Sequence, residues 1–122
     1  MLSGGQRQRV VIARALVVKP KLIIADEPVS MLDVSIRAEI LELMNEIRNK
    51  NNISFIYITH DLATAKYFAD KIIILNAGKI VEFGNINNVL TKPVHQYTKS
   101  LIEAISEPDH ENLYKEKNVD SV

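Results

Sequence analysis

The sequence LIIADEP at residues 22–28 decides the fold class of this chain. Its apolar run predicts a buried parallel strand, and Pro28 ends that strand because proline has no backbone N–H group to pair with a neighbour. Asp26 and Glu27 are then expected at the carboxyl end of the strand, where open α/β sheets place their ligands. Two adjacent carboxylates there suit a site for Mg²⁺ and phosphate, and they also suit the plain start of a loop.

The chain has 122 residues, of which 47% are hydrophobic, and its 15 lysines and arginines balance 15 aspartates and glutamates. This composition predicts one globular domain with a modest core. The balanced charge gives no overall electrostatic field that would favour binding to nucleic acid or to an anionic membrane. Cysteine is absent, so neither a disulfide framework nor a thiolate metal site is available, which fits a reducing compartment. The apolar runs are short, so we expect no secretory signal or membrane-spanning segment.

A helix is expected from Ser3, a good N-cap residue, to about Val18, before the Lys-Pro pair at residues 19–20. Its expected apolar face consists of Val11, Ile12, Ala15, Leu16 and Val18. Glycines at residues 4–5 leave the first N–H groups uncovered, so that an anion can approach the positive end of the helix dipole. The alternative interpretation is an ordinary capped helix with a flexible entrance.

A second helix is expected over residues 34–50, with Asp33 as a suitable cap. Its apolar stripe, which predicts a core-facing side, consists of Ile36, Ile40, Leu43, Met44 and Ile47. The residues expected on its solvated side are Arg37, Glu39, Glu42, Glu46 and Arg48. Residues 53–58 are β-branched and aromatic, as is typical of another buried strand. If the two strands are neighbours, His60 reaches the same sheet edge as Glu27.

A short helix, a hairpin and two amphipathic helices are expected after residue 60. In order they are a helix over 62–68 capped by Asp61, strands over 71–75 and 79–83 joined by a turn at 76–78, and helices over 86–90 and 94–105. Residues 106–122 show little periodicity and are expected to form a solvated or frayed tail. The histidines at 60, 95 and 110 do not have the spacing of metal ligands.

Several segments together resemble the nucleotide-binding domains of ABC ATPases. The sequence LSGGQ at residues 2–6 resembles their signature motif, LIIADE at 22–27 their Walker B strand, and SMLD at 30–33 their D-loop. His60 resembles the histidine of their H-loop. The order and spacing also match, and motifs in register are far more specific than any one alone. More loosely, residues 93–101 look like the segment after the core in importers of oligopeptides, dipeptides and nickel.

The resemblance implies an α/β fold: a partial P-loop NTPase over residues 1–105, comprising the C-terminal part of a mainly parallel sheet, flanking helices and a terminal β-hairpin. It implies ATP and Mg²⁺ as cofactors, and two subunits paired head to tail with each ATP between the phosphate loop of one and the signature helix of the other. Other implied partners are transmembrane permease subunits and, indirectly, an extracytoplasmic substrate-binding protein. The implied location is the cytoplasmic face of the membrane. Nucleic acid is not among the implied partners.

The resemblance also carries site roles onto matching positions. The residues implied to complete the ATP site of the partner subunit are Ser3, Gly4, Gly5, Gln6 and Asp33. Asp26 is implied to support Mg²⁺, Glu27 to polarise the attacking water, and His60 to contact the γ-phosphate. Loss of the Glu27 carboxylate is then expected to slow chemistry more than binding.

The chain departs from the family pattern because it contains no G-x-x-x-x-G-K-[ST] phosphate loop, no glutamine loop and no adenine-stacking aromatic residue before the signature. We therefore expect the C-terminal part of an importer ATPase subunit, for peptides or nickel, that is inactive alone. The alternative is a non-catalytic partner or remnant. An ABC ATPase of DNA repair or chromosome organisation is less favoured, because a nucleic-acid or coiled-coil pattern is missing. Uncovered apolar strand surface predicts marginal stability or self-association.

Overall fold

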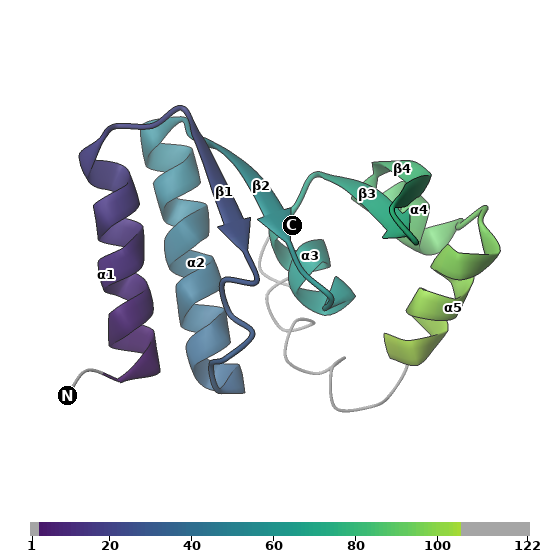
Figure 1. The fold of residues 1–122 in the computed structure, drawn as a ribbon, viewed down its shortest axis with the longest axis horizontal. Helices are drawn as coiled ribbons and strands as arrows, with labels where there is room; N and C mark the ends of the chain where they lie inside the picture. Colours follow the sequence, from purple (N-terminus) through teal and green to yellow (C-terminus); the bar gives the residue numbers. More distant parts are fainter. Residues whose placement is uncertain (1–2, 106–122) are drawn as a thin grey trace, which may run out of the picture. The chain divides into compact units, whose positions relative to one another are not determined.

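The computed structural model describes residues 3–105, which divide into two compact units, one ending at His60 and the other beginning at Asp61 (Figure 1). The first unit contains α1 (Gly4–Val17), β1 (Leu22–Asp26), α2 (Val34–Asn51) and β2 (Ser54–Ile58). The second contains α3 (Leu62–Phe68), β3 (Lys71–Asn76), β4 (Lys79–Asn85), α4 (Ile86–Thr91) and α5 (Gln96–Ile105). Each element expected between residues 3 and 105 is present, with ends within one or two positions of the expected ones. The expected tail over 106–122 lies outside the described residues.

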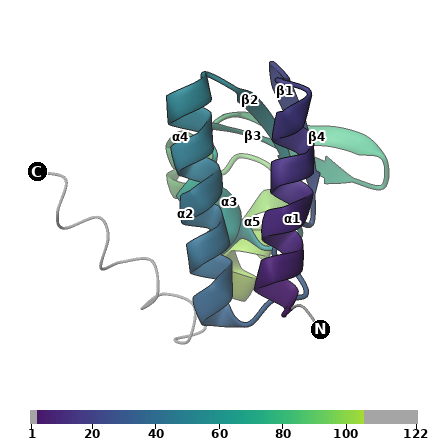
Figure 2. The same ribbon diagram turned by 90° about the vertical axis from the view of Figure 1, so that its left-hand side faces the viewer.

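Strands β1 and β2 pair in parallel, in a register that runs from Leu22 opposite Ser54 to Asp26 opposite Ile58. Helix α2 connects them and lies beside α1 (Figures 1 and 2). The buried apolar side chains of this unit are Ala25, Val29, Ile40, Leu41, Met44, Ile47 and Ile53. The predicted apolar stripe of α2 is therefore confirmed at Ile40, Met44 and Ile47. It missed Leu41, and two of its members, Ile36 and Leu43, are only half-buried.

One face of the β1–β2 sheet is exposed, which corrects the expectation of buried strands and confirms the expectation of uncovered apolar strand surface. The exposed apolar side chains on the two strands are Leu22, Ile24, Ile56 and Ile58, between 46% and 64% accessible. Parallel sheets are ordinarily covered on both faces, and among the described residues of this unit, 3–60, only the other face is covered. The expected apolar face of α1 is likewise wrong at Val11 and Val18, which are 54% and 77% exposed.

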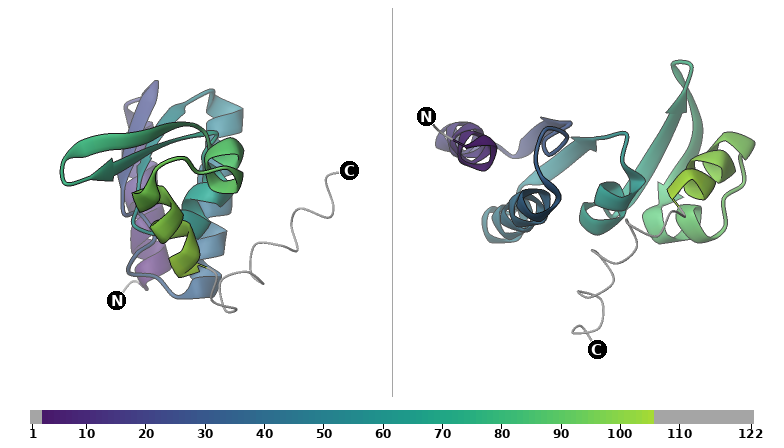
Figure 3. Two further views of the ribbon diagram at one scale, coloured as in Figure 1. Left: turned by 90° about the vertical axis from the view of Figure 1, so that its right-hand side faces the viewer. Right: turned by 90° about the horizontal axis from the view of Figure 1, so that it is seen from below.

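In the second unit, β3 and β4 form an antiparallel hairpin whose last pair, Asn76 opposite Lys79, leaves a two-residue turn. The turn residues Ala77 and Gly78 both have positive φ angles, 50° and 74°, as a type I′ hairpin turn requires. Helices α4 and α5 contact the hairpin, and α5 also contacts α3 (Figure 3). Between residues 3 and 105, no helix is both long enough and apolar enough to cross a lipid bilayer.

Candidate functional site

The carboxyl end of β1 turns sharply at Glu27. Asp26 is the last residue of the strand, and the backbone N–H of Glu27 still donates to the carbonyl of Ile58 on β2, at 2.8 Å. Glu27 then adopts a φ angle of 48°, in the left-handed region that costs a residue with a β-carbon roughly 1–2 kcal/mol. Strain of this kind at a strand end is a feature of functional sites, and here it directs the glutamate away from the strand.

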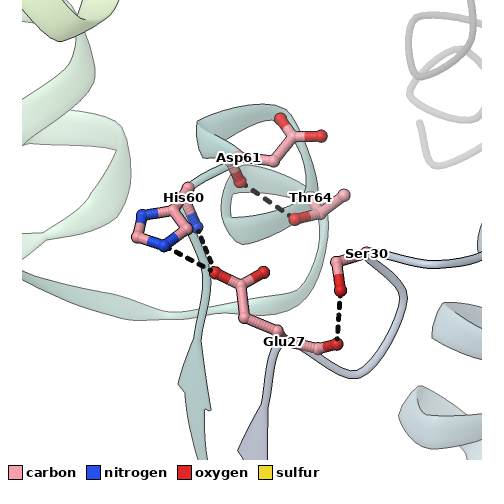
Figure 4. A network of polar contacts seen from close by, with 5 residues as sticks. All are labelled: Glu27, Ser30, His60, Asp61 and Thr64. Atoms are coloured by element: carbon pink, nitrogen blue, oxygen red, sulfur yellow. Dashed lines mark hydrogen bonds and ion pairs between the residues drawn. The ribbon is translucent and has the colours of Figure 1, made fainter.

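Glu27 and His60 meet at this edge of the sheet (Figure 4). One carboxylate oxygen of Glu27, Oε1, accepts the backbone N–H of His60 at 3.1 Å and lies 3.2 Å from its ring nitrogen Nε2. The side chain of Glu27 is 28% exposed and that of His60 is 99% exposed. The expectation that both residues reach one edge is thus confirmed.

The two carboxylate oxygens of Glu27 differ in their partners. Within residues 3–105, Oε2 of Glu27 accepts no hydrogen bond, whereas Oε1 is held from both the backbone and the ring of His60. A carboxylate fixed through one oxygen has the other in a defined direction, as a group that accepts a proton or orients a water molecule must have. The pair is therefore suited to general base chemistry.

The backbone just after Glu27 is also held locally. Its carbonyl accepts the hydroxyl of Ser30 at 3.2 Å and the backbone N–H of Ser30 at 3.4 Å (Figure 4). After His60, Asp61 begins α3 as expected, because its carboxylate accepts the N–H of Ala63 at 2.9 Å. The hydroxyl of Thr64 donates to the carbonyl of Asp61, also at 2.9 Å. These bonds fix the two chain segments that carry the glutamate and the histidine.

Asp26 presents an exposed carboxylate beside Glu27. This carboxylate makes no hydrogen bond or ion pair with any residue between 3 and 105. Mg²⁺ is commonly held by one or two carboxylates together with phosphate oxygens and water, and a single unengaged carboxylate fits that role. Over the same described range, no group of three or more His, Asp or Glu side chains could enclose a metal by itself. A cation here would need ligands from a bound phosphate.

The first turn of α1 is fixed by a capping box. The Ser3 hydroxyl accepts the N–H of Gln6 at 3.2 Å, and the Gln6 side chain accepts the N–H of Ser3 at 2.9 Å. The N–H groups of Gly4 and Gly5 lie in the same turn, where helical N–H groups have no intrahelical acceptor. Two donors therefore remain for an anion at the positive end of the helix.

The glycines are packed rather than flexible, which corrects the interpretation of a loose helix entrance. Gly5 is buried, and a β-carbon there would lie 2.8 Å from Cγ2 of Ile36 on α2. A β-carbon on Gly4 would lie 3.0 Å from Cδ2 of Leu32. The sequence carries no local signal for this close approach, because the contacts come from residues about 30 positions away.

Asp33 is the N-cap residue of α2 by position, but its side chain makes no capping hydrogen bond. The expectation that it caps the helix is confirmed only for the backbone, through the N–H of Arg37 donating to the Asp33 carbonyl at 2.8 Å. Its carboxylate is exposed and thus available to another group. Arg37 itself corrects the predicted solvated face, because it is half-buried and its guanidinium binds two loop carbonyls.

The parallel βαβ arrangement, with the carboxylate–histidine pair at its edge, has the fold of part of an ABC-type ATPase. Residues 1–30 match the family model described as ABC transporter. A solved structure of an ABC transporter in an inward-facing conformation superimposes with a TM-score of 0.71 and 31% identity, covering 84% of this chain and 39% of that one.

Two curated relatives are named for peptide transport. The dipeptide transport ATP-binding protein DppF of Lactococcus lactis is 52% identical over 107 residues, which are 88% of this chain and 34% of that protein. The oligopeptide transport ATP-binding protein OppF of Streptococcus mutans is 51% identical over 107 residues, 88% of this chain and 35% of that protein. The chain is similar to these ABC transporter ATP-binding proteins, and it spans about a third of their length.

Proposed function

We propose that this chain is the part of an importer ATPase subunit that carries the signature motif, the Walker B acids, the D-loop and the H-loop histidine. The observation that carries the proposal is the pairing of Glu27 with His60 through a single carboxylate oxygen, at 3.1 and 3.2 Å. In the complete domain, ATP is the substrate and is hydrolysed between the two halves of a head-to-tail dimer. Peptides are the proposed cargo, because the curated relatives are named for peptide transport.

Glu27 is the proposed general base. The free oxygen Oε2 accepts a proton from the attacking water, while His60 holds Oε1 and so fixes the orientation of the carboxylate. The exposed ring of His60 is proposed to contact the γ-phosphate from the same edge. A water positioned in this way attacks in line with the leaving group, and positioning supplies most of the catalysis in phosphoryl transfer.

Asp26 is proposed to support Mg²⁺. Its carboxylate is exposed, and among residues 3–105 it has no competing partner. Bound Mg²⁺ would neutralise charge that develops on the phosphate oxygens during transfer. Asp26 would hold it from the protein side, leaving Glu27 for the water.

Ser3, Gly4, Gly5 and Gln6 are proposed to complete the ATP site of a second subunit. The N–H groups of the first turn of α1 provide donors and a positive dipole end for the phosphates. Asp33 is proposed to reach the same partner near its phosphate loop, since its exposed carboxylate is not used as a cap. The sequence in hand contains no phosphate loop, so that element has to come from another polypeptide segment.

The remaining proposed partners follow from the importer class. Transmembrane permease subunits would dock the complete domain at the cytoplasmic face of the membrane, and an extracytoplasmic binding protein would deliver the peptide. The alternative proposal is a non-catalytic module that only presents α1 to an intact subunit. The missing phosphate-loop motif favours it, because tight ATP binding by these residues alone then lacks its main lysine and amide donors.

A chimaera tests the catalytic proposal. This chain would replace the matching third of the Lactococcus relative, which supplies a phosphate loop. We expect the chimaera to hydrolyse ATP, and we expect Glu27→Gln to lower the rate by about 100-fold or more while ATP binding stays within about 3-fold. Glu46→Gln, an exposed α2 position, is the matched control and should not change the rate. Hydrolysis that survives Glu27→Gln would refute the assignment.

A mixing experiment tests the module proposal. A full-length relative whose own signature serine and glycines have been replaced would be assayed with and without this chain. If the chain acts in trans, its addition restores hydrolysis, and a Gly5→Asp variant of the chain does not. If wild-type chain restores nothing, the module proposal fails, whatever the chimaera does.

A further inference from the structure

The loop between β1 and α2 is held by an arginine that lies beyond its end. The guanidinium Nε of Arg37 donates to the carbonyl of Leu32 at 2.7 Å, and Nη2 donates to the carbonyl of Ser30 at 3.3 Å. The backbone N–H of Arg37 donates to the carbonyl of Asp33 at 2.8 Å. A single residue in the first turn of α2 thus binds three carbonyls of the D-loop, residues 30–33.

The other bonds of this loop, at 3.2 to 3.4 Å, are longer than the 2.7 Å bond from Nε of Arg37. The N–H of Ser30 reaches the carbonyl of Glu27 at 3.4 Å, and the N–H of Leu32 reaches the carbonyl of Val29 at 3.2 Å. Met31 is 94% exposed, and the side chain of Asp33 makes no capping bond. Bonds from a charged donor are stronger than neutral ones, so the guanidinium is the strongest side-chain restraint on the loop among residues 3–105.

Through Leu32 the same restraint reaches α1. The Leu32 side chain lies against Gly4, where a β-carbon would come within 3.0 Å of it. Holding the Leu32 carbonyl therefore fixes the loop against the first turn of the signature helix. The planar guanidinium suits this task, because its donors have a fixed geometry that the single ammonium of lysine lacks.

We propose that Arg37 is a positioning residue, which holds the D-loop so that the Asp33 carboxylate and the N–H groups of Gly4 and Gly5 keep a fixed spatial relation. The consequence for catalysis rests on the proposed function, since it requires a partner subunit to meet both groups at once. Arg37 touches neither nucleotide nor water in this scheme and acts through the loop.

Hydrogen exchange of the 122-residue chain tests the restraint without any assay of activity. In Arg37→Met we expect the amides of Ser30 and Leu32 to exchange at least about 10-fold faster, while those of Ile40 and Met44 in the α2 core stay unchanged. Arg37→Lys should recover part of the protection, because an ammonium still reaches one carbonyl. Arg48→Lys, at another half-buried arginine of α2, should leave the loop amides unchanged.

The guanidinium of Arg37 can also be observed directly by nuclear magnetic resonance. In wild-type chain the Nε–H proton of Arg37 should exchange slowly with water and show a coupling across the hydrogen bond to the carbonyl carbon of Leu32. Fast exchange of this proton, or equal acceleration of loop and core amides in Arg37→Lys, would overturn the proposal. If Arg37→Met unfolds the chain, the amides of Ile40 and Met44 in the core also exchange faster. The exchange of the loop amides in Arg37→Lys then decides whether Arg37 holds the loop.

The mixing experiment supplies the functional readout. A positioning role predicts that Arg37→Met lowers the maximal restored ATPase rate by about 10-fold or more, with a smaller change in the chain concentration that gives half the effect. An unchanged maximal rate overturns the positioning role even if the loop amides are deprotected. If wild-type chain restores no hydrolysis, the proposed function in trans fails, and hydrogen exchange still decides whether Arg37 holds the loop.

Discussion

Oε1 of Glu27 lies 3.1 Å from the backbone nitrogen of His60 and 3.2 Å from its Nε2, so one oxygen is held by two parts of the same residue. The hydrogen bond from the backbone and the contact of the ring differ in what a mutation can remove. A substitution at position 60 deletes the ring but leaves the backbone N–H in place. The glutamate can therefore stay oriented when the ring is lost, and the contributions of ring and backbone can be separated.

Replacing His60 by alanine should spare the fold and impair chemistry. Its side chain is 99% exposed, so the free energy of unfolding should change by no more than about 0.5 kcal/mol in urea titrations. In the chimaera we expect the ATPase rate to fall by about 100-fold, because the proposed contact with the γ-phosphate is lost. His60→Gln, which keeps a side-chain donor, should retain more of the rate. Equal rates for wild type and His60→Ala would argue against any role of the ring.

Alanine at the two signature glycines should have unequal effects on stability. At Gly5 the new β-carbon meets Cγ2 of Ile36 at 2.8 Å, a branch fixed next to the backbone, and overpacking of this kind costs about 1–3 kcal/mol. At Gly4 it meets the flexible end of Leu32, which can move aside. The helix gains about 0.5–1 kcal/mol from either alanine, so we expect Gly5→Ala to lower the free energy of unfolding and Gly4→Ala to leave it nearly unchanged. Similar midpoints of urea unfolding for Gly4→Ala and Gly5→Ala would contradict this packing.

Glu82 should make the second unit sensitive to acid. The buried Thr98 hydroxyl contributes most to lowering the pKa of Glu82 below its ordinary value of 4.5, although its geometry falls short of a hydrogen bond. The backbone N–H groups of His95 and Val94, at 3.0 and 3.1 Å, lower it further. Because the folded pKa is lowered, the stabilisation is complete above pH 4.5 and is lost as the pH falls through the folded value.

The matching experiment compares unfolding at different pH values. In Glu82→Gln the free energy of unfolding should fall less steeply below pH 4.5 than in wild type, because the titrating carboxylate is gone. Glu103→Gln, which removes an exposed carboxylate of α5 without a hydrogen-bond partner among residues 3–105, should keep the wild-type slope. If both variants retain that slope, Glu82 is not the group responsible.

The uncovered sheet face should make the isolated chain self-associate. Ile24 is 64% exposed and Ile56 is 49% exposed, and they are register partners on neighbouring strands. A formal net charge of zero adds no repulsion between copies. We expect sedimentation velocity to show concentration-dependent association that Ile24→Glu weakens. Val94→Glu, at an 83% exposed site outside the sheet, is the control. A wild-type chain that stays monomeric at all concentrations would contradict this expectation.

The sequence predicted the elements well because their signals are local. The helix caps, the apolar spacing of α2 and the turn at Ala77 and Gly78 each depend on residues within a few positions of one another. The meeting of Glu27 with His60 followed from one topological rule, that parallel neighbouring strands end at the same edge. That rule also needs β1 and β2 to be neighbours, which the sequence left open and the structure shows.

What the sequence could not predict depends on contacts between distant residues. The burial of Gly5 against Ile36 and the exposure of Val11 are set by how α1 lies on α2. Arg37 was assigned to a solvated face because helical spacing predicts only the side of the helix on which a residue lies. It does not predict that Arg37 binds carbonyls of the preceding loop. The apolar run of β1 predicted buried strands, and only the missing neighbouring segments of the family pattern predicted the uncovered surface.

The parallel pairing of β1 with β2 also determines when each strand can find its partner during synthesis. Ser54 follows its partner Leu22 by roughly 30 positions, so at ribosomal speeds of about 5–20 residues per second β1 waits about 2 to 6 s for β2. The β3–β4 hairpin needs only its two-residue turn and can close within about 10 μs of emerging. Strand β1, which leads to both acids, thus waits far longer for β2 than β3 waits for β4. Its apolar edge is then open to chaperones and to other nascent chains for seconds before the site can form.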